Sequence, residues 1–245
     1  MTAGNNPSVS FRQRLDARVS RCSSVADLAA AVAERFAVLI QQAIADRGRA
    51  SIVLSGGRTP ESYLSAIAAG ALPWQRLDFF LSDERWVDED SPYSNAALIR
   101  RALLARDGPS KAHFTAMKNS AATAASGVAA AVAALPPLEQ HYDLALLGMG
   151  ADGHFASLFP GMADLARWLE SDNAERLVAV PAPSTAPPPI PRLSMTAAEI
   201  KRSRNIVLVL QGKEKMRVLE QAAIEGDVLA LPVRALGEVE VIWCP

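Results

Sequence analysis

Short apolar runs alternate with amphipathic segments along most of this chain, and this alternation limits the folds that it can adopt. Runs at 51–54, 77–81, 142–147, 177–180, 205–210 and 239–243 have the length and composition of buried strands. Helical spacing of apolar residues predicts helices over 24–47, 60–69, 94–105, 119–134 and 211–224. Strands that alternate with helices pair in parallel through right-handed crossovers. The sequence therefore predicts an α/β fold with one open, mostly parallel sheet and helices on both faces.

No break in the chain resembles a linker between domains. Residues 1–245 are therefore predicted to form a single α/β domain. The stretch 181–191 is rich in proline, but it is too short for a linker and predicts a stiff surface loop.

Charge and cysteine usage exclude several classes of protein. The 25 basic and 26 acidic residues nearly balance, which argues against a nucleic-acid partner. No apolar run approaches the roughly 18 residues of a membrane span, and the N-terminus lacks the apolar region of a secretory signal, so no membrane partner is expected. Cys22 and Cys244 lie at opposite ends without a CxxC motif. We therefore expect neither a disulfide framework nor a zinc ribbon. We expect a cytoplasmic location, where thiols stay reduced.

A glycine-rich loop, Ser55-Gly56-Gly57-Arg58-Thr59-Pro60, follows the strand at 51–54. Its glycines let the backbone approach a ligand closely, and the following helix N-terminus offers N–H groups to an anion. The hydroxyls of Ser55 and Thr59 add donors, so the loop has the design of a phosphate cradle. No Gly-Lys-Ser/Thr follows, so this is not a Walker A loop. A turn that needs glycine only for its geometry explains the same residues.

A second glycine-rich loop, 148–154, follows the strand at 142–147 and formally matches GxGxxG. Pro160-Gly161 interrupts the long helix that a dinucleotide site requires, so a nicotinamide site is a poor fit. His154 and Asp152 remain to be explained. A histidine near a carboxylate at a strand end can act as a general base at neutral pH. The alternative is that Asp152 caps a short helix and His154 has no role.

Cations near strand ends or helix starts form a third group of candidates. Arg85 follows the strand at 77–81, within Ser82-Asp83-Glu84-Arg85, and its planar guanidinium suits phosphate or an oxyanion. A surface ion pair of Arg85 with Asp83 or Asp88 is an equally good explanation. Lys213 opens a predicted helix, where a cation is unfavourable unless an anion binds nearby. The same reasoning assigns Lys215 to solvent.

Other catalytic schemes find little support. The three histidines, His113, His141 and His154, are far apart and form no HxxxH motif, so no metal site is predicted from them. An Mg²⁺ site at Asp83 and Glu84 stays open as an alternative. No GxSxG elbow is present.

These loops together, in this order, resemble the 6-phosphogluconolactonase family. The matching segments are LSGGRTP (54–60), FFLSDERWV (79–87) with Ser94-Asn95, YDLALLGMGADGHFASLFPG (142–161), PRLSMT (191–196) and GKEK (212–215). The resemblance implies a Rossmann-like fold and hydrolysis of 6-phospho-D-glucono-1,5-lactone, a small sugar-phosphate partner, without metal or other cofactor.

Residue by residue, the resemblance places the catalytic base at His154 and its supporting carboxylate at Asp152. The phosphate loop falls on Ser55, Gly56, Gly57, Arg58 and Thr59. The remaining substrate contacts fall on Asp83, Arg85, Gly150, Arg192 and Lys213. Phe155 stands where threonine is expected, and the proline-rich stretch before Arg192 is another departure from the family.

Two alternative functions share this pattern. Related amino-sugar phosphate deaminases carry a glutamate that assists ring opening, and the aligned residue here is Phe159, which cannot transfer protons. A non-enzymatic sugar-phosphate sensor would keep the phosphate contacts without needing a base. The pair of His154 with Asp152 favours an enzyme.

Overall fold

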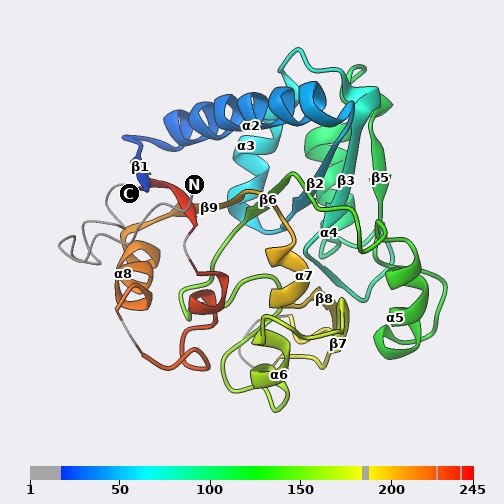
Figure 1. Ribbon diagram of the computed structural model, residues 1–245, viewed down its shortest axis with the longest axis vertical. Coiled ribbons are helices and arrows are strands. Elements are labelled where there is room, and N and C mark those ends of the chain that lie inside the picture. Colours follow the sequence, from blue (N-terminus) through cyan, green and yellow to red (C-terminus); the bar gives the residue numbers. More distant parts are fainter. Residues whose placement is uncertain (1–17, 184–187, 225, 238) are drawn as a thin grey trace.

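The computed structural model of this chain describes residues 18–183, 188–224, 226–237 and 239–245. Its central sheet has seven parallel strands in the order β1-β10-β9-β6-β2-β3-β5 (Figure 1). These strands are β1 (Val19–Arg21), β2 (Ala50–Leu54), β3 (Leu77–Leu81), β5 (His113–Thr115), β6 (Leu144–Leu147), β9 (Ile206–Gln211) and β10 (Glu240–Cys244). The predicted parallel sheet is confirmed, and the short edge strands β1 and β5 are additions to it.

Helices pack around this sheet, with α2 and α3 on one side and α7 on the other (Figure 1). The helices are α2 (Val25–Arg47), α3 (Arg58–Ala68), α4 (Asn95–Ile99), α5 (Ala124–Ala133), α6 (Leu165–Leu169), α7 (Ala197–Lys201) and α8 (Lys213–Ala222). Short helical turns are η1 (Trp74–Arg76), η3 (Pro109–Lys111) and η4 (Pro232–Leu236), and η2 (Arg100–Leu104) is a π-helical segment.

Several predicted helix bounds need correction. The helix predicted over 94–105 divides into α4 and the π-helical η2. The helix predicted over 119–134 begins only at Ala124, because Thr123 and Ser126 form a capping box there. Helix α3 begins two residues before Pro60.

A second sheet of three antiparallel strands lies beside the first. It contains β4 (Asp83–Arg85), β8 (Arg192–Met195) and β7 (Leu177–Val180), in that order. The strand predicted over 177–180 therefore exists, but it pairs with β8 and lies outside the central sheet. This pairing places Arg85 directly opposite Arg192.

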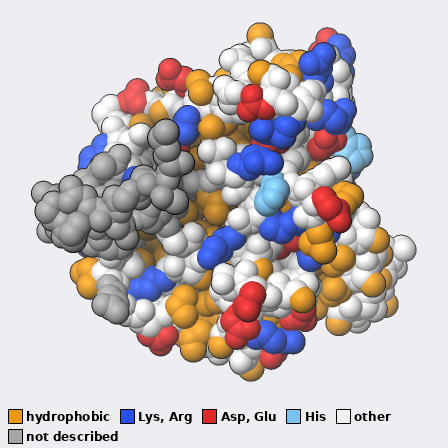
Figure 2. All heavy atoms as spheres, viewed as in Figure 1, with side chains coloured by type: hydrophobic (Ala, Val, Ile, Leu, Met, Phe, Trp, Pro, Cys, Tyr) orange, Lys and Arg blue, Asp and Glu red, His pale blue; other side chains and the backbone are white. Residues whose placement is uncertain are grey.

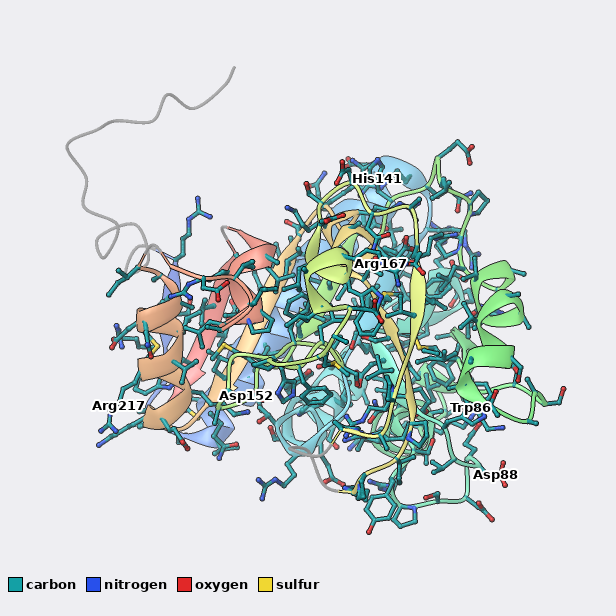
Figure 3. The ribbon with its side chains drawn as sticks, turned by 90° about the horizontal axis from the view of Figure 1, so that it is seen from below. Trp86, Asp88, His141, Asp152, Arg167 and Arg217 are labelled. Carbon is teal, nitrogen blue, oxygen red and sulfur yellow. The ribbon has the colours of Figure 1, made fainter. Side chains whose placement is uncertain are left out.

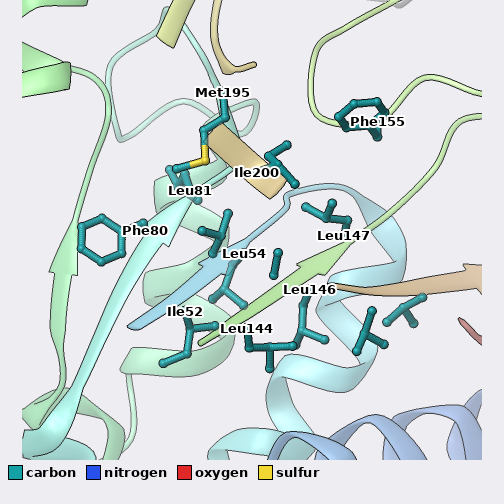
Figure 4. Close-up of a cluster of buried hydrophobic side chains, with 14 of the residues drawn as sticks. Ile52, Leu54, Phe80, Leu81, Leu144, Leu146, Leu147, Phe155, Met195 and Ile200 are labelled. Atoms are coloured by element: carbon teal, nitrogen blue, oxygen red, sulfur yellow. The ribbon is translucent and has the colours of Figure 1, made fainter. Parts of the chain in front are cut away.

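The core between the layers is built from aliphatic side chains of β2 and β6. Ile52 pairs in register with Leu144, and Leu54 pairs with Leu146. Figure 4 shows these residues with Ile200 of α7 close by, and all five side chains are buried. The carboxyl ends of β2 and β6 are thereby held rigidly side by side.

Helix α2 corrects the expectation that no segment approaches the length of a membrane span. By length and composition alone, its 23 residues would suffice to cross a membrane. Its many alanines raise the mean hydropathy, and four of its larger apolar residues, Leu28, Val32, Phe36 and Ile40, are buried in the core of the fold. Packing against the sheet therefore accounts for the apolar face of this helix.

The remaining predictions concern the surface and the chain ends. Residues 1–17, where no secretory signal is expected, and 184–187 of the proline-rich loop lie outside the described residues. Cys22 directly follows β1 and Cys244 ends the neighbouring β10, and both are free thiols. Acidic as well as basic side chains are present on the face shown in Figure 2.

Candidate active site

The candidate site lies where the chain reverses its direction across the central sheet. From β2 the chain moves to β3 and β5 on one side, and then returns to β6 on the other. Loops at such a switch point diverge and leave a crevice at the carboxyl ends of the strands. Ser55 joins the two loops here: its N–H donates to Leu146 O at 3.1 Å, and its Oγ accepts from Gly148 N at 3.0 Å.

An open cavity of about 180 Å³ occupies this crevice. Ten of the predicted site residues line it: Ser55, Gly56, Gly57, Arg58, Thr59, Asp83, Arg85, Gly150, His154 and Arg192. The cavity is also lined by Pro60, Asn95, Gly148, Met149, Ala156 and Lys215. Asp152 and Lys213 do not line the cavity, but Asp152 is in contact with His154, which does.

The loop after β2 presents a helix N-terminus to this cavity. Gly57 has φ of 108°, a conformation that strongly favours glycine, and it precedes α3 without a capping side chain. The first N–H groups of α3 therefore remain available to an anion. Gly56 packs so closely against the Asn95 side chain that a Cβ atom would overlap it. Both glycines are thus required by the backbone geometry of the loop.

Lys215 and Arg58 add positive charge beside this helix N-terminus. Burial lowers the pKa of Lys215, the charge of Arg58 lowers it further, and Asp152 opposes the change. The prediction that Lys215 points to solvent is wrong, and Lys213 is the exposed member of the pair. Lys213 and Lys215 project from α8 in directions about 200° apart, so they cannot both face the cavity. Helical side chains lean toward the helix N-terminus, and of the two only Lys215 reaches the cavity.

Two guanidinium groups enter the cavity from the small sheet. Arg85 and Arg192 are direct cross-strand neighbours in β4 and β8, an arrangement that is unfavourable for like charges. Burial lowers the pKa of Arg192; Asp83 opposes this, and Arg85 adds to it. Asn95 Oδ1 accepts a hydrogen bond from Arg85, and Asn95 Nδ2 donates to Asp83 O at 2.8 Å. An anion between the guanidinium groups would relieve their repulsion.

The carboxylates of Asp83 and Glu84 have different surroundings. Asp83 lines the cavity, and its Oδ2 accepts from Ser157 Oγ at 2.6 Å. Glu84 is fully buried, and its carboxylate accepts from the N–H groups of Asn95 and Ala96, each at 2.8 Å. Burial raises the pKa of Glu84, although these N–H groups partly offset the effect. Glu84 therefore holds the start of α4, which carries Asn95.

His154 and Asp152, both in the loop after β6, form a hydrogen-bonded imidazole–carboxylate pair. His154 Nδ1 lies 2.5 Å from Asp152 Oδ1, and both side chains are partly exposed. Burial opposes ionisation of Asp152, but its hydrogen bonds and charge interaction with His154 outweigh this, so its pKa lies below the ordinary value. A Cβ atom on Gly150 would overlap the imidazole. Glycine at 150 therefore makes room for the pair.

The arrangement around His154 suits general base chemistry. With Asp152 accepting from Nδ1–H, the imidazole presents Nε2 as its basic nitrogen. Figure 3 shows Asp152 between α8 and α3, the two helices that carry Lys215 and Arg58. No long helix follows this loop, since α6 has only 5 residues, so the GxGxxG match does not build a dinucleotide site.

Sequence reasoning did not identify Asn95 or Lys215 as individual site residues. A signal for Lys215 was available, because a side chain three residues into a helix leans back over its N-terminus. Asn95 belongs to a segment that carries the family resemblance, but its role could not be predicted, because its contacts with Arg85 and Asp83 form only in the folded chain.

Comparison with known proteins agrees with this geometry. The family described as "Glucosamine-6-phosphate isomerases/6-phosphogluconolactonase" matches residues 23–243. The chain belongs to this family.

Members of the family resemble the chain over nearly its whole length. A 6-phosphogluconolactonase of Pseudomonas putida is 36% identical, with 93% of each chain covered. The crystal structure of a 6-phosphogluconolactonase from Shewanella baltica has a TM-score of 0.86 at 35% identity, covering 93% of this chain and 97% of the other. A monomeric glucosamine-6-phosphate deaminase shares the fold, with a TM-score of 0.75 and 20% identity, covering 93% and 97%.

Proposed function

We propose that this chain hydrolyses 6-phospho-D-glucono-1,5-lactone to 6-phospho-D-gluconate. The observation that carries the proposal is the His154–Asp152 pair, with 2.5 Å between His154 Nδ1 and Asp152 Oδ1, in which His154 lines a cavity with four cationic side chains. Those cations are Arg58, Arg85, Arg192 and Lys215. A base and an anion-stabilising wall are the two things that hydrolysis of an activated ester requires.

The phosphate group is assigned to the subsite made by the α3 N-terminus, Arg58, Thr59 and Lys215. A helix N-terminus and two cations complement a dianion at short range. The phosphate is remote from the reacting carbon, so its binding energy serves to position the lactone carbonyl near His154. Lys213, which the sequence predicts as a substrate contact, is replaced by Lys215 in the proposal.

The chemical step uses His154 first as a base and then as an acid. Its Nε2 takes a proton from water while the water oxygen attacks the lactone carbonyl carbon. Arg85 and Arg192 stabilise the oxyanion that forms. The bond between this carbon and the ring oxygen then breaks, and the ring oxygen receives the proton from His154. The carboxylic acid product ionises at neutral pH and releases one proton to solvent.

Proton release gives a direct assay. Freshly generated phosphogluconolactone should acidify a weakly buffered solution faster with the protein than without it. Unphosphorylated gluconolactone should react much more slowly with the protein, because it lacks the group that the subsite binds. Equal rates with and without protein would contradict the proposal.

Measurements of ammonia release and of ligand binding, made beside the proton-release assay, separate the alternative functions. An amino-sugar phosphate deaminase would release ammonia from glucosamine 6-phosphate, and we expect none because Phe159 cannot transfer protons. A sensor would bind the sugar phosphate without turnover. We further propose that the chain acts as a single domain, in the cytoplasm, in the oxidative pentose phosphate pathway.

A further inference from the structure

One aromatic ring contacts both the proposed base and one of the proposed oxyanion-stabilising cations. The ring centroid of Phe159 lies 4.3 Å from that of the His154 imidazole, with the planes inclined by 44°. The Arg192 guanidinium carbon lies over the same phenyl ring, 5.1 Å from its centroid. Phe159 is only 1% exposed, so its ring is held firmly by its surroundings.

Phe159 also stands between two cavities. The His154 and Arg192 side chains that it contacts line the cavity of the candidate site. Phe159 itself lines a second cavity of about 290 Å³, mainly apolar, which Met162 and Trp168 also line. Removal of the phenyl ring would give the imidazole space to turn away from the first cavity.

The contacts of His154 show why this ring matters. The hydrogen bond to Asp152 fixes one nitrogen but leaves the imidazole free to pivot about that contact. Asp152 is 41% exposed and His154 is 27% exposed, so water competes for the bond. The ring of Phe159 supplies the second constraint, because a ring packed with its centroid at 4.3 Å limits the inclination of the imidazole plane. Together the two contacts aim Nε2 into the cavity.

We propose that Phe159 is a positioning residue for the hydrolysis, holding the His154 imidazole and the Arg192 guanidinium in their working orientations. This inference rests on the proposed function and assigns Phe159 a role through His154 and Arg192, without contact with substrate. An aromatic ring is required for it, because a flat ring restrains the neighbouring imidazole and its π-system attracts a guanidinium. The smaller, aliphatic side chain of leucine has neither property.

The test compares Phe159→Leu, Phe159→Tyr and Phe159→Trp in the proton-release assay. Phe159→Leu should lower kcat by roughly tenfold to a hundredfold, the effect of misplacing a catalytic group by about 1 Å. KM should change much less than kcat. Phe159→Tyr and Phe159→Trp should keep kcat within a few-fold of the unmodified chain, since the second cavity gives a larger ring room to extend.

Phe36→Leu is the matched control. Phe36 is equally buried, and its ring stacks on Phe79 in the core of the fold. Both leucine variants should lower the thermal unfolding midpoint, and only Phe159→Leu should lower kcat. The inference is overturned if folded Phe159→Leu keeps its kcat, if only KM rises, or if tyrosine and tryptophan do no better than leucine. Failure of the unmodified chain to hydrolyse the lactone would instead overturn the proposed function.

Discussion

Ser157 donates a hydrogen bond of 2.6 Å from its Oγ to Asp83 Oδ2, and both residues are buried. Asp83 belongs to β4 beside Arg85, whereas Ser157 lies three residues after His154. The bond therefore ties the strand that carries one cation to the loop that carries the proposed base. Ser194, opposite Asp83 in the small sheet, accepts from Ser157 N at 3.1 Å and strengthens the same junction.

Ser157→Ala should destabilise the fold by about 1 to 3 kcal/mol, because the buried Asp83 carboxylate loses a hydrogen bond. The measurement is the free energy of unfolding in urea. Ser203→Ala is the control, since Ser203 Oγ is also buried but has no hydrogen-bond partner among the described residues. Equal costs for the two variants would show that the Asp83 bond is not responsible.

His154→Ala should lower kcat by roughly 10² to 10⁴, the usual contribution of a general base. The fold should survive, so the far-ultraviolet circular dichroism spectrum should match that of the unmodified chain. His113→Ala serves as control because His113 is exposed on β5, outside the cavity lining. A folded His154→Ala chain with full turnover would exclude His154 as the base.

The sequence predicts the parallel sheet well because its central strands are continuous apolar runs. It does not reveal β4 or β8, since three- and four-residue strands with mixed polarity have no distinctive periodicity. Arg85 and Arg192 are singled out as cations, but only the antiparallel pairing of those strands places them opposite each other. Local spacing also cannot choose between Lys213 and Lys215 without the orientation of α8. Contacts distant in sequence decide these features.

Lys215→Ala should raise KM for the phosphorylated lactone by roughly 10- to 150-fold, the equivalent of losing a charged contact of about 1.5 to 3 kcal/mol. Lys213→Ala should leave KM nearly unchanged because Lys213 is exposed and does not line the cavity. Arg217→Ala is a second control, since Arg217 projects outward from α8 (Figure 3). The reverse ranking of Lys213 and Lys215 would disprove the assignment of the phosphate subsite.

Activity should persist after exhaustive dialysis against EDTA. The carboxylates that an Mg²⁺ site would use already accept hydrogen bonds, Asp83 from Ser82 and Ser157 and Glu84 from Asn95 and Ala96. Binding a cation there would break several of these bonds. Turnover is measured before dialysis, after it, and after Mg²⁺ is added back. Loss of turnover that Mg²⁺ restores would make Asp83 and Glu84 metal ligands.

The stability of the fold should fall in acid partly through Glu199, which lies outside the cavity. Its side chain is 1% exposed and accepts hydrogen bonds from Arg176, Arg202 and Tyr142. Burial opposes its ionisation, but these donors outweigh burial, so its pKa lies below the ordinary value. A carboxyl with a lowered pKa stabilises the fold above its unfolded pKa, about 4.3, and this contribution is lost as pH falls through the folded pKa.

Glu199→Gln should therefore cost about 3 to 5 kcal/mol at pH 7, where two largely but not fully buried guanidinium groups lose their counter-charge. The difference in unfolding free energy from the unmodified chain should begin to shrink as the pH falls below about 4.3, where the carboxyl of the unfolded chain becomes protonated. It should disappear as the pH falls through the lower pKa of the folded chain. Urea denaturation from pH 7 to pH 3 measures this difference. Glu139→Gln, at an exposed position, should show no such trend. A cost that stays constant across this range would mean that the Glu199 charge does not stabilise the fold.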